Sequence, residues 1–177
     1  MDGLKNFFLH SRALLVVFVS AIVLAQSMKS PFDSGLQLES VTAHGRAPYA
    51  TLTGQDLRGR DLRYIDLTGA DLTNADLRGA NLMYSILTGA NLTGANLESA
   101  YLLGARMNGL VAIGANFQRS ILQYTDFQNG DVSNADFSGA DLGRSNLSYL
   151  NVSGAIFDNA NLSGTDLTET DLSVAHD

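Results

Sequence analysis

Apolar residues recur every five positions along most of this chain. From Leu52, steps of five reach Leu57, Leu62 and Leu67 and continue in phase to Leu172. Leu fills 17 of these 25 centre positions and Phe fills four, and Asp or Asn is the usual residue one place before each centre. A small residue usually stands two places before the centre, and Gly stands two places after it in 12 of the 25 repeats. A period of five matches neither the 3.6-residue helix nor the two-residue strand.

The chain must therefore turn once in every repeat to keep all centres on one side. Gly at the recurring position supplies that turn, because Gly accepts a positive φ at the second central residue of a type II turn. Asp or Asn nearby can bond to backbone groups of the turn. Self-similarity at a fixed short period predicts a solenoid built from stacked coils.

The pattern of a small residue, Asp or Asn, Leu and two further residues resembles the repeat of the pentapeptide repeat family. The resemblance covers residues 50–174, about seven-tenths of the chain. It implies an all-β fold, a right-handed quadrilateral parallel β-helix with four repeats per coil and about six coils. The centre residue and the small residue before it would point inward, and the other three would point outward.

Two features of the sequence agree with a coil of twenty residues. Phe117, Phe137 and Phe157 are spaced by 20 and would stack in one interior column. The repeat around position 112 exchanges its two inward residues, with Leu110 at the small place and Ala112 at the large one. Such an exchange roughly conserves buried volume, which packed cores tolerate best.

Residues 1–25 have the layout of a secretory signal peptide. A basic front precedes an apolar run at 13–25, and small side chains come before Gln26. The run is short for a membrane span, which needs about 20 apolar residues. A hydrophobic helix that is retained as an anchor, extended to residues 4–25, is the alternative.

Three further segments complete the predicted domain organisation. Residues 26–49 are expected to form a linker and an N-terminal cap over the first coil, with a disordered tether as the alternative. Residues 50–174 form the β-helix, and residues 175–177 are a tail. The last coil has no capping segment after it, which suggests end-to-end pairing with a second copy or with a partner.

Composition excludes several classes of function. The chain has 177 residues, a net charge of −7 and no cysteine. An acidic surface argues against binding nucleic acid, which requires a basic footprint. The residue pattern holds no credible nucleophile and base, and Asp alternates with Asn on flat faces, which is a poor cage for Ca²⁺. We therefore expect no catalytic site, no cofactor and no metal.

One stretch of the solenoid carries apolar residues at places that should face outward. Contiguous exposed apolar surface usually marks an interaction site, and Tyr and Met are favoured there. Alternatively, the N-terminal segment folds back onto this surface, or the surface has no role. The predicted partner-binding residues are Met83, Tyr84, Tyr101, Leu103, Ile121 and Tyr124.

These features favour a non-enzymatic scaffold that binds a protein partner outside the cytosol. Exported members of the family resemble this chain and are found in the thylakoid lumen or periplasm, so a membrane-associated photosynthetic complex is a reasonable partner. A second hypothesis is an acidic rod that mimics DNA and binds DNA gyrase, as some family members do. A third is a structural repeat protein without a fixed ligand.

Overall fold

The computed structural model describes residues 45–176. The predicted signal peptide or anchor helix at 1–25 and the linker at 26–44 lie outside the described residues.

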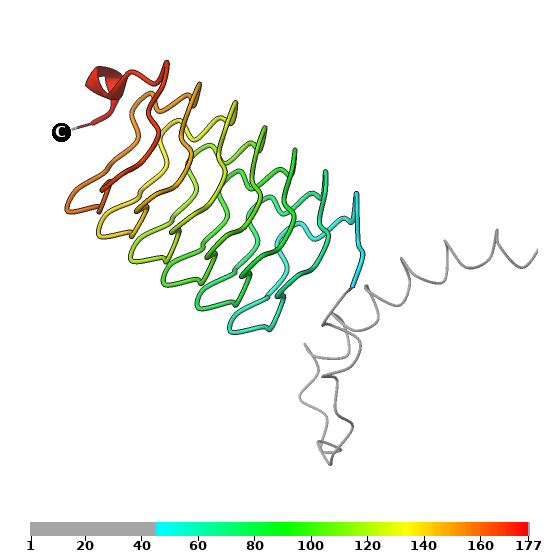
Figure 1. Ribbon diagram of the computed structural model, residues 1–177. Coiled ribbons are helices and arrows are strands. Elements are labelled where there is room, and N and C mark those ends of the chain that lie inside the picture. The colour runs from blue at the N-terminus through cyan, green and yellow to red at the C-terminus, as the bar shows by residue number, and fades with distance from the viewer. Residues whose placement is uncertain (1–44, 177) are drawn as a thin grey trace, which may run out of the picture. The chain divides into compact units, whose positions relative to one another are not determined.

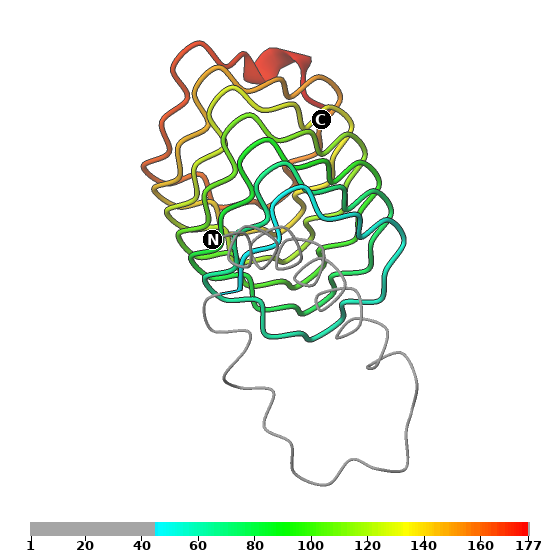
Figure 2. The same ribbon diagram turned by 90° about the vertical axis from the view of Figure 1, so that its right-hand side faces the viewer.

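The described chain is a stack of coils that repeats every twenty residues (Figure 1). The residue before each centre forms a parallel bridge with the residue twenty positions later, from Arg46–Asp66 to Asn146–Asp166. These bridges run along four sides, so that each coil has a four-sided outline (Figure 2). Residues 46–176 make about six and a half such coils, the right-handed quadrilateral parallel β-helix that pentapeptide repeats imply.

Three backbone hydrogen bonds per repeat join neighbouring coils. The amide of Leu52 donates to the carbonyl of Asp71 at 2.7 Å, and the amide of Asp71 donates to the carbonyl of Ala50 at 2.9 Å. The amide of Gly54 donates to the carbonyl of Thr73 at 2.8 Å, and the same three bonds recur on all four sides. Each coil therefore supplies hydrogen-bond partners to the backbone amide and carbonyl groups of its neighbours, as the strands of a sheet do.

A tight turn links each repeat to the next. The residue two places after each centre has φ between +56° and +71° at every repeat from Tyr49 to Glu169. The residue before it has negative φ, and the amide of Gln55 closes the turn on the carbonyl of Leu52 at 3.2 Å. The predicted turn is confirmed, and it is kept where Tyr, Asn or Arg replaces Gly.

The ladder starts earlier and ends differently than the sequence predicts. Residues 45–49, expected in the cap, form one more repeat centred on Ala47, whose amide donates to Asp66 at 2.7 Å. Ala replaces Leu there, and Pro48 occupies the first central position of the turn, which it favours. At the other end, the 3₁₀ helix η1 (Leu172–Val174) interrupts the square path. His176, expected in the tail, bridges Ile156.

The interior is a set of columns of identical spacing. Phe137 stacks on Phe117 with ring centroids 4.8 Å apart and on Phe157 at 5.1 Å, which confirms the predicted column. Phe127 meets the rings of Phe117 and Phe137 edge-on at 6.1 Å. In the last coil the inward residues are only half-buried: Phe157, Leu162, Leu167 and Leu172.

The exchange of large and small inward residues extends beyond one repeat. Leu110 and Ala112 are both fully buried, as predicted. In the column of small residues, Gly130 lies between Leu110 and Leu150, and a Cβ on it would come within 2.8 Å of one Leu and 3.2 Å of the other. In the neighbouring column of centres, the same step along the stack goes from Ala112 to the larger Val132. Volume is thus balanced across two columns.

One pair of like charges is stacked in the ladder, Asp56 beside Asp76. Arg58 contacts both carboxylates, at 2.6 Å to Asp56 and 3.6 Å to Asp76, and Arg78 binds Asp76 at 2.6 Å. Hydrogen bonds from Arg58 lower the pKa of Asp56, and those from Arg78 lower the pKa of Asp76. The arginines offset the repulsion that two stacked carboxylates would otherwise feel.

Gly130→Ala tests the balance of volume in the core. The added methyl overlaps two leucine side chains, so we expect a loss of about 1–3 kcal/mol in unfolding free energy. Leu110→Ala in the same chain makes room for the methyl, and the double variant should lose less than the sum of the single losses. Urea unfolding of the four proteins measures the coupling. Strict additivity would show that Leu110 does not limit the space at position 130.

Arg58→Gln should lower the thermal stability at pH 7 more than Arg63→Gln does. Arg63 pairs with Asp61, which faces Asn81 rather than a second carboxylate. The folded-state pKa values of Asp56 and Asp76 lie below the unfolded values of about 4, so their stabilisation is complete above pH 4 and is lost as pH falls through the folded values. Thermal melts from pH 7 to pH 2 should show the gap between wild type and Arg58→Gln closing. A gap that widens on acidification would contradict this account.

Candidate partner-binding face

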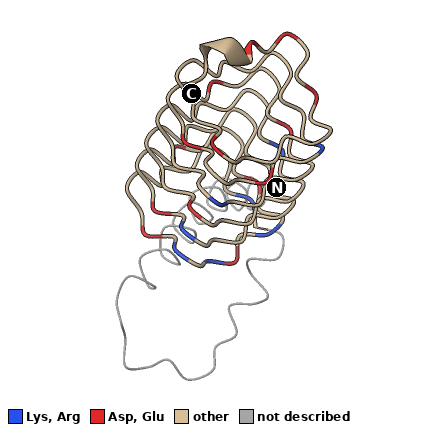
Figure 3. Ribbon diagram, turned by 90° about the vertical axis from the view of Figure 1, so that its left-hand side faces the viewer, with Lys and Arg blue, Asp and Glu red and all other residues tan. Residues whose placement is uncertain are grey.

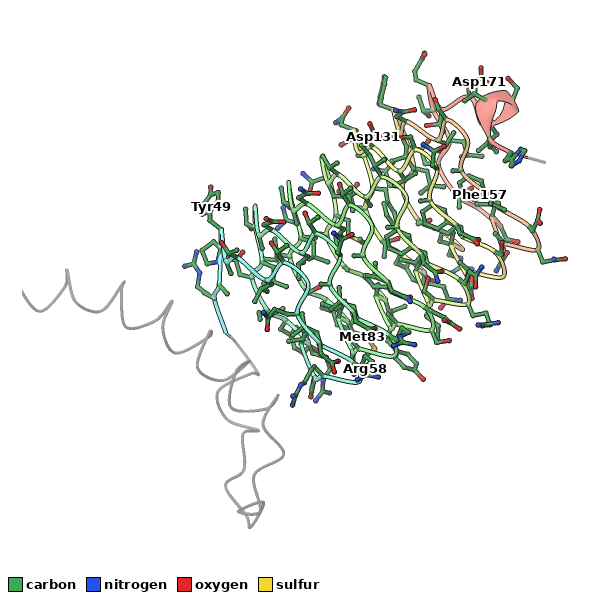
Figure 4. The ribbon with its side chains drawn as sticks, turned by 180° about the vertical axis from the view of Figure 1, so that it is seen from behind. Tyr49, Arg58, Met83, Asp131, Phe157 and Asp171 are labelled. Atoms are coloured by element: carbon green, nitrogen blue, oxygen red, sulfur yellow. The ribbon has the colours of Figure 1, made fainter. Side chains whose placement is uncertain are left out.

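The six predicted partner-binding residues lie on one side of three successive coils and the corner beside it. Tyr101 and Ile121 are neighbours in the ladder, and Met83 and Leu103 occupy the same turn place twenty residues apart. Tyr84 and Tyr124 stand at the following corner, forty residues apart. We call these six residues the aromatic face; Met83 is labelled in Figure 4.

The aromatic side chains of this face are partly open to solvent. Tyr84 and Tyr101 are each 46% exposed and Tyr124 is 54% exposed. Met83, Leu103 and Ile121 are half-buried among them. The face thus offers partly exposed aromatic rings beside apolar side chains, a combination that is enriched in protein interfaces.

The corner of this face is a stack of side chains that starts one coil earlier. The ring of Tyr64 stacks on that of Tyr84, with centroids 5.4 Å apart and planes 11° apart. The ring of Tyr84 in turn covers Gly104, where a Cβ would lie 2.7 Å from two ring carbons. Sequence reasoning missed Tyr64, although its spacing of 20 from Tyr84 could have identified it.

Tyr124 continues the corner toward the C-terminal coils. Arg144 donates a hydrogen bond to the Tyr124 hydroxyl at 2.6 Å, and its guanidinium carbon lies 5.7 Å from the ring centroid. Such an arrangement combines a charge-assisted hydrogen bond with a cation–π contact. It keeps a positive charge at the edge of the aromatic face.

Charged residues border the aromatic face at both ends. On the N-terminal side Asp61 pairs with Arg63 at 2.6 Å, and hydrogen bonds from that arginine lower the pKa of the carboxyl. On the C-terminal side Asp141 accepts hydrogen bonds from Gln123 at 2.7 Å and Asn161 at 2.9 Å. The six residues of the aromatic face therefore lie between charged residues, with Tyr64 extending the corner by one coil.

A smaller apolar spot lies on another side of the solenoid. Val111 and Ile113 are 37% and 38% exposed. Val111 stands between Asn91 and Asp131 in its ladder column, so polar residues surround the spot. It provides a reference surface of similar chemistry but smaller extent.

The described part of the chain offers little for other chemistry. Within residues 45–176, no group of three His, Cys, Asp or Glu side chains is placed to hold a metal ion. Over the same range, no helix has the length and apolar character needed to cross a bilayer. Many outward aspartates instead bond to their own turns, as Asp71 does with the amide of Thr73 at 3.0 Å.

Comparison with known families identifies the repeat. The family model described as pentapeptide repeats (8 copies) matches residues 50–89, 84–110, 100–139 and 135–173. The chain belongs to the pentapeptide repeat family. This membership supports a non-enzymatic repeat protein and leaves its specific role open. A comparison with curated proteins finds no match.

Several solved pentapeptide repeat structures are similar to this chain. One is a thylakoid lumen protein of Arabidopsis thaliana, with 27% identity over 60% of this chain and 70% of that chain, and a TM-score of 0.46. Another is HetL, involved in heterocyst differentiation regulation in the cyanobacterium Nostoc, with 26% identity, 75% and 74% coverage, and a TM-score of 0.35. A third is QnrB1, a plasmid-mediated fluoroquinolone resistance protein, with 18% identity, 76% and 81% coverage, and a TM-score of 0.41.

Gly104→Ala tests whether the backbone of the next coil positions Tyr84. Gly104 and Gly89 have φ of +65° and +64°, so Ala at either place loses about 1–2 kcal/mol to the left-handed backbone. Only at Gly104 must the methyl also displace the Tyr84 ring, because nothing lies within 4 Å of a Cβ at Gly89. Gly104→Ala should therefore cost more, as measured by urea unfolding.

Tyr84→Ala provides the control for this pair of variants. Removing the ring should make Gly104→Ala and Gly89→Ala equally costly. If the two glycine variants are already equal in the wild-type background, the contact between Tyr84 and position 104 does not constrain the ring.

Proposed function

We propose that this pentapeptide repeat protein is a non-enzymatic scaffold that binds a protein partner through the aromatic face. The observation that carries the proposal is the grouping of Met83, Tyr84, Tyr101, Leu103, Ile121 and Tyr124 on one side of three coils. Elsewhere the outward places of the described coils carry mostly polar residues. An apolar and aromatic surface bordered by charged residues fits the anatomy of a protein interface.

The fixed positions of two tyrosine side chains support the proposed binding of a partner. Tyr84 is stacked between Tyr64 and the turn at Gly104, and Tyr124 is bound by Arg144. Binding a partner would therefore freeze few additional rotamers. Because ordering side chains costs about 0.5–1.5 kcal/mol each, rings that are already held favour affinity.

The place of action is proposed from the N-terminal sequence. Residues 1–25 favour export, and the resemblance to exported family members favours the thylakoid lumen or periplasm and a membrane-associated photosynthetic complex as the partner. The mature protein is then either released by cleavage before Gln26 or anchored through residues 4–25. End-to-end pairing through the half-buried last coil remains a prediction.

DNA mimicry is the second candidate function, and the charge of the C-terminal coils favours it. Residues 126–176 contain eight acidic residues and one arginine. Export would separate the protein from cytosolic gyrase, so the first proposal accounts for more of the chain. Inhibition or protection of gyrase in a supercoiling assay with the 26–177 fragment would favour the second.

Replacing Tyr84, Tyr101 and Leu103 together by Ser should abolish co-purification of the partner from the protein's own cell. All three side chains are outward, so the melting temperature should stay close to that of wild type. Val111→Ser/Ile113→Ser is the control, because it removes exposed apolar residues from another side. Partners that remain bound to the triple variant would overturn the proposal.

The same preparation tests the place of action. A soluble protein whose intact mass begins at Gln26 would support cleavage and release, and a membrane-bound protein that retains Met1 would support the anchor. Recovery of the uncleaved chain from the cytosol would contradict export.

A further inference from the structure

Charge is unevenly distributed along the solenoid. Residues 77–125, which hold the aromatic face, contain three arginines and a single acidic residue, Glu98. Residues 126–176 contain eight acidic residues and only Arg144. Figure 3 shows arginines in the coils toward the N-terminal end of the ladder and acidic residues continuing into the last coils. The aromatic face thus lies in a locally cationic belt of an acidic protein.

Two of the three arginines in this belt are neutralised within the described chain. Arg78 pairs with Asp76 at 2.6 Å, and Arg119 pairs with Glu98. The third, Arg106, is exposed, and its guanidinium makes no ion pair with any described residue. Its positive charge is therefore available.

The acidic neighbour of Arg106 in the ladder accepts hydrogen bonds from other groups. Asp126 stands beside Arg106 in the ladder. Its carboxylate accepts hydrogen bonds from the side-chain amide of Asn146 and the backbone amide of Gln128, both at 3.1 Å. The other ladder neighbour, Ile86, is apolar. Neither neighbour forms an ion pair with Arg106.

Arg106 and Arg144 flank the corner of the aromatic face. Arg106 follows two residues after Gly104, the turn that the ring of Tyr84 covers. Arg144 reaches Tyr124 from the next coil and, among the described residues, forms a hydrogen bond to that tyrosine rather than an ion pair. Arg144 thus contacts an exposed ring of this corner, and Arg106 follows the corner two residues later in the chain.

We propose that the aromatic face recognises a segment of another protein that carries apolar side chains with carboxylates beside them, received by Arg106 and Arg144. This inference rests on the proposed function and specifies the chemistry of its partner. Arg binds carboxylates in bidentate geometry, and Arg and Tyr dominate interface energetics. Complementary charge would also speed the encounter of the partner with this cationic region of an acidic rod.

The surroundings favour a peptide segment over a membrane or a nucleic acid. Asp141 makes no ion pair with a described residue and borders the face at its C-terminal end, so an extended anionic surface laid across the face would meet this carboxylate. Two arginines are also far fewer than the basic footprint that a nucleic acid requires. A narrow segment can place its carboxylates at the arginines and avoid Asp141.

Site-specific photo-crosslinking of the full chain in its own cell tests this inference. A benzophenone amino acid replaces Leu103 on the aromatic face, and in a control protein it replaces Ile113, which stands at the same turn place on another side. Cross-linked peptides are identified by mass spectrometry. The probe at 103 is then combined with Arg106→Gln/Arg144→Gln or with Arg78→Gln/Arg119→Gln. The two pairs change net charge equally, but only the first pair removes arginines without an ion pair.

We expect the probe at 103, and not at 113, to capture a segment of another protein with Asp or Glu close to the adduct. Arg106→Gln/Arg144→Gln should lower the yield about tenfold, equivalent to about 1.4 kcal/mol, and Arg78→Gln/Arg119→Gln should leave it within about twofold. Equal losses in both pairs, or a captured segment without acidic residues, would overturn the inference and leave the proposed function standing. Adducts only with lipid, with another copy of this chain or with its own N-terminal segment would overturn both, as would equal yields at 103 and 113.

Discussion

A residue with positive φ once in every five positions is the constraint on which this structure depends. It turns the chain by the same amount at each repeat, so that four repeats close a coil and every residue meets its counterpart twenty positions later. The hydrogen-bonded ladder and the columns of Leu and Phe both follow from that registration. Because the turn is kept where Gly is absent, the inter-coil hydrogen bonds must offset the cost of a left-handed backbone at 13 non-glycine residues, Tyr49 among them (Figure 4).

The same constraint couples the surface to the backbone. A side chain at the left-handed position lies against the turn of the next coil, so its size limits what that coil can carry. Tyr49 covers Gly69 and Tyr84 covers Gly104 in this way, and Asn74 and Asn134 cover Gly94 and Gly154. Five of the six tyrosines stand at such corners. The ring of Tyr84, held between Tyr64 and Gly104, is thus ordered before any partner arrives.

The stacking of the coils also determines which charged side chains are paired. Carboxylates in neighbouring coils lie about one strand spacing apart, ~4.8 Å, so they need either an amide between them or an arginine beside them. Arg58 contacts the carboxylates of both Asp56 and Asp76. The side-chain amide of Asn146 and the backbone amide of Gln128 donate hydrogen bonds to Asp126. The pairing of arginines therefore differs from one part of the surface to another. Most arginines of the described coils are engaged by nearby carboxylates, whereas Arg106 and Arg144 remain available beside the aromatic face.

The sequence alone determined that the chain turns once in every repeat, because a five-residue period with Gly at one place fits neither a helix nor a simple strand, and the resemblance to the pentapeptide repeat family implied the four-sided coil. The sequence also located the Phe column, the exchange of Leu110 with Ala112 and the six residues of the aromatic face, since side chains spaced by 20 share a column. Tertiary structure decided what the repeat pattern does not encode. The first repeat is centred on Ala47 and the last turns into η1, because a chain end has a neighbouring coil on one side only. Tyr64 and Arg144 join the aromatic face through contacts between coils, and the lack of an ion pair between Arg106 and the described residues also depends on where each side chain points and on which groups its neighbours already bind.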